Sequence, residues 1–135
     1  MASIHKEVLL DVPVDQAWAA LRDVGNAHRL FAGVLVDAKL DGDVRTVTFA
    51  NGMVARERII DIDDRRHRVA YAAQGDPFSH HSASMQVFGE PDGRARFVWT
   101  SDFLPADVGP KIAPLIEEGC RALKRNLEAQ AQRVA

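Results

Sequence analysis

Residues 44–62 read VRTVTFANGMVARERIIDI, and this stretch decides the fold. Asn51-Gly52 near its centre is a strong hairpin signal, because both central residues of a type I′ turn need positive φ. On the side before the turn, Val47 and Phe49 alternate with polar residues, as is typical of a β-strand. The stretch therefore predicts two antiparallel strands joined by a tight turn.

The period-two pattern continues on both sides of this hairpin. Together with a first strand over residues 4–12, it predicts about seven strands, and those after the first form an antiparallel meander because short turns separate them. By simple alternation, Val34, Val36 and Ala38 share one face. The other strand segments are residues 34–40, 68–73, 79–89 and 97–103, with turns at Asp41-Gly42, Asp63-Asp64, Gly75-Asp76-Pro77 and Pro91-Asp92-Gly93.

Helical spacing appears near the two ends of the chain. After Pro13, an apolar face that includes Trp18 predicts a first short helix, and Trp18 is expected in the core. A second short helix carries Leu30 and Phe31. After residue 105 an apolar stripe predicts a long helix that covers the buried face of the sheet. Pro114 lies within that stripe and removes a helix hydrogen bond, so we expect a late start or a kink there.

Composition restricts the classes of protein to consider. A chain of 135 residues with 47% hydrophobic and 27% charged residues fits one soluble globular domain. No apolar stretch approaches the ~20 residues of a membrane span, and the N-terminus lacks a signal region, which predicts a cytoplasmic protein without stable membrane insertion. A net charge of −2 does not favour nucleic acid as a partner. A homodimer is compatible with the sequence but not required by it.

Four motifs occur in a recognisable order: DVPVDQAWAAL (11–21), VARERIIDID (54–63), RHRVAY (66–71) followed by a glycine, and Asp92-Gly93 with RFVW (96–99) and FLP (103–105). Together they resemble the START and polyketide-cyclase superfamily (SRPBCC), the helix-grip proteins that include the birch-pollen allergens and the plant abscisic-acid receptors. The resemblance implies an α+β fold over residues 1–135, in which a curved antiparallel sheet wraps around a long C-terminal helix and two short helices follow the first strand. It also implies a lipid-like, polyketide-like or aromatic ligand.

Glu57 is the most informative charged residue. Arginines flank it on both sides, so alternation places Glu57 on the opposite face, with Ala55 and Ile59. If the arginines face water, the carboxylate faces a cavity, where it could polarise a ligand. The alternative is a cross-strand salt bridge on the outer face, which is favoured by Ile60 and Ile62 sharing the arginine face. The resemblance matches Glu57 to a glutamate that lines the pocket of the plant hormone receptors.

His80 and His81 are adjacent, so on a strand they point to opposite faces and cannot readily share a metal ion. No other His or Cys stands at a metal-ligand spacing, so we predict no metal site, and we also predict no cofactor. His81 shares the more apolar face with Ala83 and Met85 and is expected to face inward, whereas the resemblance favours His80. A histidine in a pocket could act as an acid or base near neutral pH, or simply donate a hydrogen bond.

Two other positions each have two interpretations. Tyr71 is expected to face inward, where its hydroxyl could contact a ligand or be satisfied at the edge of the core. Gly119 interrupts the stripe of the long helix at a cost of about 1 kcal/mol, either to leave room for a ligand or to permit close packing. The predicted ligand-binding residues are Phe49, Glu57, Ile59, Tyr71, His81, Met85, Phe97, Trp99, Ile112, Leu115, Ile116 and Gly119.

Three functional hypotheses follow. The first is a module that binds a small hydrophobic molecule between the sheet and the C-terminal helix. The second is a cyclase or dehydratase in which Glu57, His81 or Tyr71 moves protons in the same cavity. The third is a protein-interaction module with a filled core. The sequence contains no nucleophile, phosphate-loop or dinucleotide motif, and Cys120 is expected to be a small buried hydrophobe.

Overall fold

The computed structural model describes residues 2–134. All seven described strands join one antiparallel sheet in the order β1-β7-β6-β5-β4-β3-β2. This arrangement, with short helices after the first strand and a long helix at the end, confirms the predicted helix-grip fold. The elements are β1 (Ser3–Leu10), α1 (Val14–Arg22), η1 (Val24–Asn26), α2 (Ala27–Leu30), β2 (Leu35–Asp41), β3 (Val44–Phe49), β4 (Val54–Asp63), β5 (Arg68–Gln74), β6 (His80–Gly89), β7 (Ala95–Leu104), η2 (Ala106–Val108) and α3 (Gly109–Val134).

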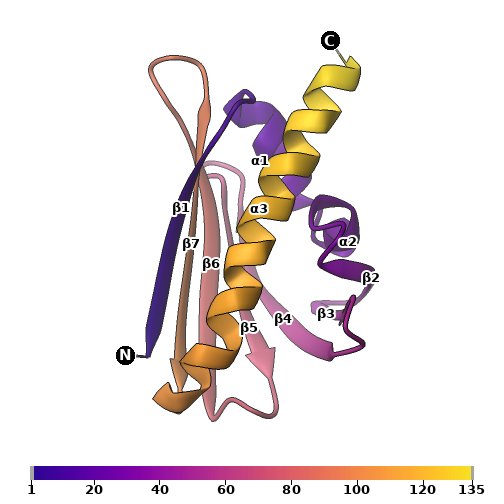
Figure 1. Cartoon of the computed structure of the whole chain (residues 1–135), viewed down its shortest axis with the longest axis vertical. Coiled ribbons are helices and arrows are strands. Elements are labelled where there is room, and N and C mark those ends of the chain that lie inside the picture. Colours follow the sequence, from indigo (N-terminus) through magenta and orange to yellow (C-terminus); the bar gives the residue numbers. More distant parts are fainter. Residues whose placement is uncertain (1, 135) are drawn as a thin grey trace.

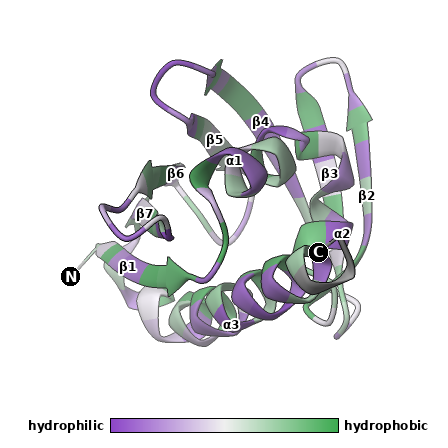
Figure 2. Ribbon diagram, turned by 90° about the horizontal axis from the view of Figure 1, so that it is seen from above, coloured by the Kyte–Doolittle hydropathy of each residue, from purple (hydrophilic) through white to green (hydrophobic). Residues whose placement is uncertain are grey.

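The sheet is curved, and α3 lies across its concave side (Figure 1). Seen from above, the strands follow an open curve from β1 round to β2, and α3 spans the open side of that curve (Figure 2). The helix packs against β1 at one end of the curve and against α2 at the other. Because β1 and β2 are the edge strands and do not pair with each other, the sheet is open between them, and the helix closes this side.

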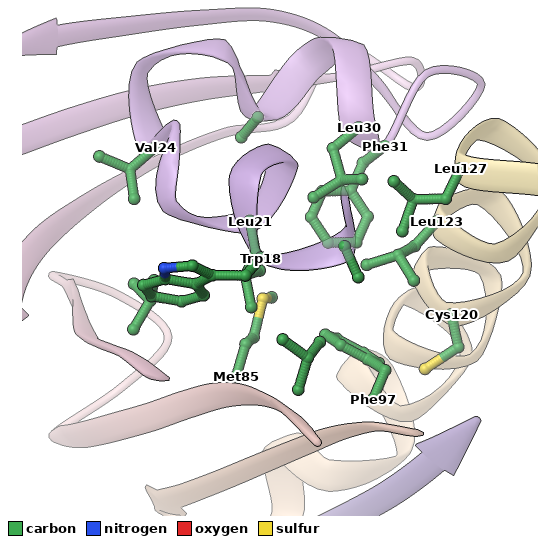
Figure 3. Close-up of a cluster of buried hydrophobic side chains, with 14 of the residues drawn as sticks. Trp18, Leu21, Val24, Leu30, Phe31, Met85, Phe97, Cys120, Leu123 and Leu127 are labelled. Atoms are coloured by element: carbon green, nitrogen blue, oxygen red, sulfur yellow. The ribbon is translucent and has the colours of Figure 1, made fainter. Parts of the chain in front are cut away.

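The core lies between the sheet, the short helices and the second half of α3 (Figure 3). Leu123 and Leu127 of α3 are almost completely buried, and Phe97 of β7 lies opposite them. Trp18 is buried here as its helical spacing predicted, and its indole N–H donates to Asp64 at the β4–β5 turn (3.0 Å). The core therefore joins α3 to both the sheet and the N-terminal helices.

A β-bulge at Ile60 reverses the inward and outward alternation in the last part of β4. The pairing with β5 shifts between Ile59 and Asp61, so Ile60 has no partner and is 60% exposed. Beyond the bulge, Ile62 returns to the inner face and pairs with Val69. Ile60 and Ile62 thus lie on opposite faces. They do not both share the arginine face, which was the reason to expect Glu57 on the outer face.

A second bulge overturns one sequence expectation. The pairing of β2 with β3 shifts between Leu35 and Asp37, which leaves Val36 without a partner. Leu35 and Ala38 are buried, whereas Val36 is 60% exposed. The prediction that Val36 shares the inner face with Ala38 is therefore wrong, because an inserted residue reverses the alternation.

Helix α3 begins at Gly109 and continues through Pro114. Of the two expectations at this proline, the late start is therefore wrong, and the kink stays a prediction. Pro114 has no N–H to donate to the carbonyl of Pro110, which lies four positions earlier in the first turn. Only this one hydrogen bond, near the N-terminal end of the helix, is lost. Within residues 2–134, no helix combines the length and the apolar character that a membrane crossing needs.

We expect Leu123→Ala to lower the free energy of unfolding by about 2–5 kcal/mol, because it removes a buried side chain that joins α3 to the core. The matched control on the same helix is Glu118→Ala, an exposed site where a change of within about 0.5 kcal/mol is expected. Urea unfolding measures both. Equal effects of the two substitutions would contradict the packing described here.

Candidate ligand-binding site

A cavity of about 140 Å³ lies between the inner face of the sheet and the first half of α3. Most of its wall is apolar, and Met85, Trp99 and Ile116 form part of it. The more exposed wall residues come from the β3–β4 turn, the β5–β6 loop and the first turns of α3, among them Met53 (46% exposed) and Phe78. The cavity therefore opens between these three segments.

Most of the predicted site residues meet at this cavity. Ile59 and Phe97 are exceptions, because both pack in or against the core without lining the cavity. Phe97 lies beneath the second half of α3, near Cys120, where the helix and sheet are in close contact (Figure 3). The predicted residues on the cavity wall are Phe49, Glu57, Tyr71, His81, Met85, Trp99, Ile112, Leu115, Ile116 and Gly119.

Sequence reasoning missed two polar residues of the wall, Arg45 and Ser101. Both carried a usable signal. Arg45 is two residues before Val47, so alternation places it on the same inner face. Ser101 alternates in phase with Trp99 in the same way. An arginine and a serine are usually assigned to the wet face of a sheet, which hides such residues from a search for apolar patterns.

Arg45 and Glu57 form an ion pair inside the molecule. They lie directly opposite each other on β3 and β4, with Arg45 Nη2 and Nε at 2.8 and 3.0 Å from Glu57 Oε1. The arginine also donates from Nη1 to the carbonyl oxygen of Val24 (3.3 Å) and lies 5.4 Å from the centre of the Tyr71 ring. Glu57 thus faces the cavity and is also paired across strands, which combines features of the two alternatives for this residue.

His81 faces inward and His80 is exposed, as the polarity of the strand predicted. The backbone N–H of Ala73 donates to His81 Nδ1 (2.8 Å), so the neutral ring carries its proton on Nε2. That nitrogen lies 3.3 Å from Ser101 Oγ and donates to it. Burial lowers the pKa of His81 to about 4, so the ring is neutral at physiological pH.

Tyr71 and Trp99 form the other fixed polar contact of the wall. Trp99 Nε1–H donates to the Tyr71 hydroxyl oxygen (3.0 Å). Burial, assisted by the negative charge of Glu57, raises the pKa of Tyr71, so the phenol keeps its proton. Gly119 lies against the same indole: a Cβ atom there would stand 2.9 Å from Trp99 Cζ3. The glycine therefore permits close approach of the helix to Trp99, which is the packing interpretation of this residue.

Cys120 lies on α3 beside this region but is not part of the cavity wall. It is buried, and burial raises the pKa of its thiol to about 11. The thiolate that nucleophilic chemistry requires is thus disfavoured at neutral pH.

The ion pair predicts strongly coupled stability effects. Arg45→Met leaves the Glu57 carboxylate buried without its partner, and Glu57→Leu leaves the guanidinium in the same state. Each should cost about 3 kcal/mol of unfolding free energy, whereas the double variant should cost less than either single one. Urea unfolding of the four proteins measures the coupling. Additive losses would show that the two charges do not support each other.

His81 predicts a pH dependence of stability. Its pKa is about 4 in the folded protein and near the ordinary 6.5 when unfolded, so between these values the unfolded chain binds the extra proton. Stability should therefore fall as the pH decreases through this window. His81→Asn keeps an acceptor for the Ala73 N–H but does not titrate, so its unfolding free energy should fall less between about pH 7 and about pH 4.5. If the unfolding free energies of the unmodified protein and of His81→Asn fall in parallel with pH, His81 is not the group responsible.

Comparison with solved structures shows the same fold in other proteins. A putative uncharacterized protein from Bacillus thuringiensis matches with a TM-score of 0.83 and 17% identity, over 93% of this chain and 98% of the other. A protein from Thermobifida fusca matches with a TM-score of 0.74 and 24% identity, over 96% and 91% of the two chains. The di-domain ARO/CYC BexL from the BE-7585A biosynthetic pathway matches with a TM-score of 0.80 and 16% identity, over 95% of this chain and 47% of its own.

A search of the curated proteins gave no match. The family model described as "Polyketide cyclase / dehydrase and lipid transport" matches residues 1–135. This match covers the motifs at both ends of the chain as well as the central hairpins, and it agrees with the fold and with the superfamily that the motifs resemble. The chain belongs to the polyketide cyclase/dehydrase and lipid transport family.

Proposed function

We propose that this protein binds a small, mostly apolar molecule in the cavity between the sheet and α3. The observation that carries the proposal is the cavity itself, about 140 Å³ in volume, with an apolar wall and a few polar groups already held in place. That combination is typical of small-molecule sites. A cavity of roughly 150 Å³ in another protein accommodates benzene, so one aromatic ring or a short chain suits this space.

The state of the ionisable groups favours binding over proton-transfer catalysis. Glu57 is paired with Arg45, and both ring nitrogens of His81 are engaged in hydrogen bonds within the wall. Tyr71 keeps its proton because burial disfavours its phenolate. A general base needs a free lone pair directed at the substrate. His81 offers none in this arrangement, and the Glu57 carboxylate would have to act while its Oε1 is held by Arg45. A cyclase or dehydratase in which His81 is the base therefore requires a rearrangement of the wall on substrate binding.

The interaction-module hypothesis fits less well, because it requires a filled core. The space below Ile112 and Leu115 is open, whereas the space below Leu123 and Leu127 is packed. A helix that covers a partly open space is the arrangement that a ligand-binding protein needs.

Native mass spectrometry of freshly purified protein, compared with its denatured mass, tests the proposal. We expect a retained small molecule that is lost on denaturation. Ala73→Leu, which places a larger side chain at the cavity wall, should abolish retention. The matched control is Ala72→Leu on the same strand, because Ala72 is paired with Arg58 on the opposite face of the sheet and should retain the molecule.

Loss of the molecule from both variants, or from neither, would contradict a site in this cavity. The same experiment separates binding from catalysis. If the retained compound is returned to the protein and is converted with time into a compound of different mass or different chromatographic retention, the chain is an enzyme; an unchanged compound supports a binding role.

A further inference from the structure

Tyr71 and Ser101 bring two hydroxyl groups to one side of the cavity. Tyr71 lies opposite Ala83 on β6, and Ala83 lies opposite Ser101 on β7, so the two residues belong to one row across the inner face of the sheet. Both line the cavity and both are buried. This row is therefore part of the surface that a molecule in the cavity meets.

Each hydroxyl oxygen already accepts a hydrogen bond from a nitrogen that can only donate. The indole N–H of Trp99 donates to Tyr71, and an indole nitrogen has no acceptor capacity. His81 Nε2–H donates to Ser101, and its direction is set because the Ala73 backbone N–H occupies the other ring nitrogen.

The hydroxyl protons of Tyr71 and Ser101 have no acceptor among residues 2–131, whose side chains the structure describes. A buried O–H group without an acceptor is costly, so a ligand that supplies one is favoured. The wall therefore offers two directed donors to the occupant of the cavity.

The charges of the wall select against an ionic ligand. Arg45 is neutralised by Glu57 at 2.8 Å, and His81 is neutral. An incoming carboxylate would have to displace Glu57 from Arg45 and leave that side chain as a buried, unpaired charge. Because its charges are paired, the wall favours an uncharged molecule.

We propose that the ligand is a neutral, mostly apolar molecule that presents a hydrogen-bond acceptor, a carbonyl oxygen, to the hydroxyl groups of Tyr71 and Ser101. This inference rests on the proposed function of the cavity and specifies its ligand class. A carbonyl oxygen has two lone pairs, so it has the capacity to accept from both donors. The volume of about 140 Å³ matches a single ring that carries a short carbonyl substituent.

Three probes of nearly the same shape test the proposal by NMR titration of the full chain: acetophenone, its alkene analogue α-methylstyrene, and benzoate. For the unmodified protein, acetophenone should bind roughly fivefold to tenfold more tightly than α-methylstyrene, which has no acceptor. Benzoate should bind weakest of the three. In the double variant Tyr71→Phe/Ser101→Ala, the preference for acetophenone over α-methylstyrene should fall towards equality. The two hydroxyl donors are then gone, and what remains on that side is the Trp99 indole N–H and the His81 Nε2–H that the hydroxyls had accepted from.

Glu57→Gln provides the matched test of charge. It removes the carboxylate but leaves Arg45 in the wall, so benzoate should gain roughly tenfold in affinity relative to acetophenone. α-Methylstyrene serves as the folding control for each variant, because it needs only the apolar wall.

The outcomes separate the inference from the function on which it rests. Failure of all three probes to bind the unmodified protein would overturn the proposed function and the inference with it. Equal binding of acetophenone and α-methylstyrene would leave the binding function standing and overturn the carbonyl assignment. Tightest binding of benzoate would overturn the neutral-ligand assignment. If Glu57→Gln does not fold, the three probes and the double variant still decide the result.

Discussion

The structure depends on a single constraint: α3 must close a curved sheet whose two edge strands do not meet. The helix reaches β1 on one side and α2 on the other, and its second half buries Leu123 and Leu127 against the core. Its first half covers the cavity, and Ile112 and Leu115 there are only half-buried. Tight packing in one half of the helix holds the other half over an open space, and so the fold that buries the core also creates the cavity.

The polar wall of the cavity follows from the register of the strands. Arg45 and Glu57 are directly opposed on neighbouring strands, so their pairing needs no change in the sheet. The same regular alternation puts Tyr71 and Ser101 in one row, with Trp99 and His81 close enough to fix each hydroxyl. The rigid sheet thus holds these groups in position before a ligand arrives, which lowers the ordering cost of binding.

Much of this architecture could be predicted from local patterns, because Asn51-Gly52 and the other turns punctuate a clear period-two alternation. The bulges at Val36 and Ile60 could not be predicted in this way. A single unpaired residue has no characteristic residue type, and it reverses the inward and outward alternation of the residues that follow it. Arg45 was missed because a buried arginine is tolerated only through a partner that pairing of the strands reveals. Gly119 kept two interpretations until the position of the Trp99 ring beneath it was known.

The most direct test of the account is an isotope-filtered NOE measurement on labelled protein with acetophenone. A ligand in the cavity should show NOEs from its ring protons to the methyl groups of Leu115 and Ile116 and to the ring of Tyr71, which come from opposite walls of the same space. NOEs confined to exposed methyl groups such as those of Val36 and Ile60 would place the ligand on the surface and contradict the central claim.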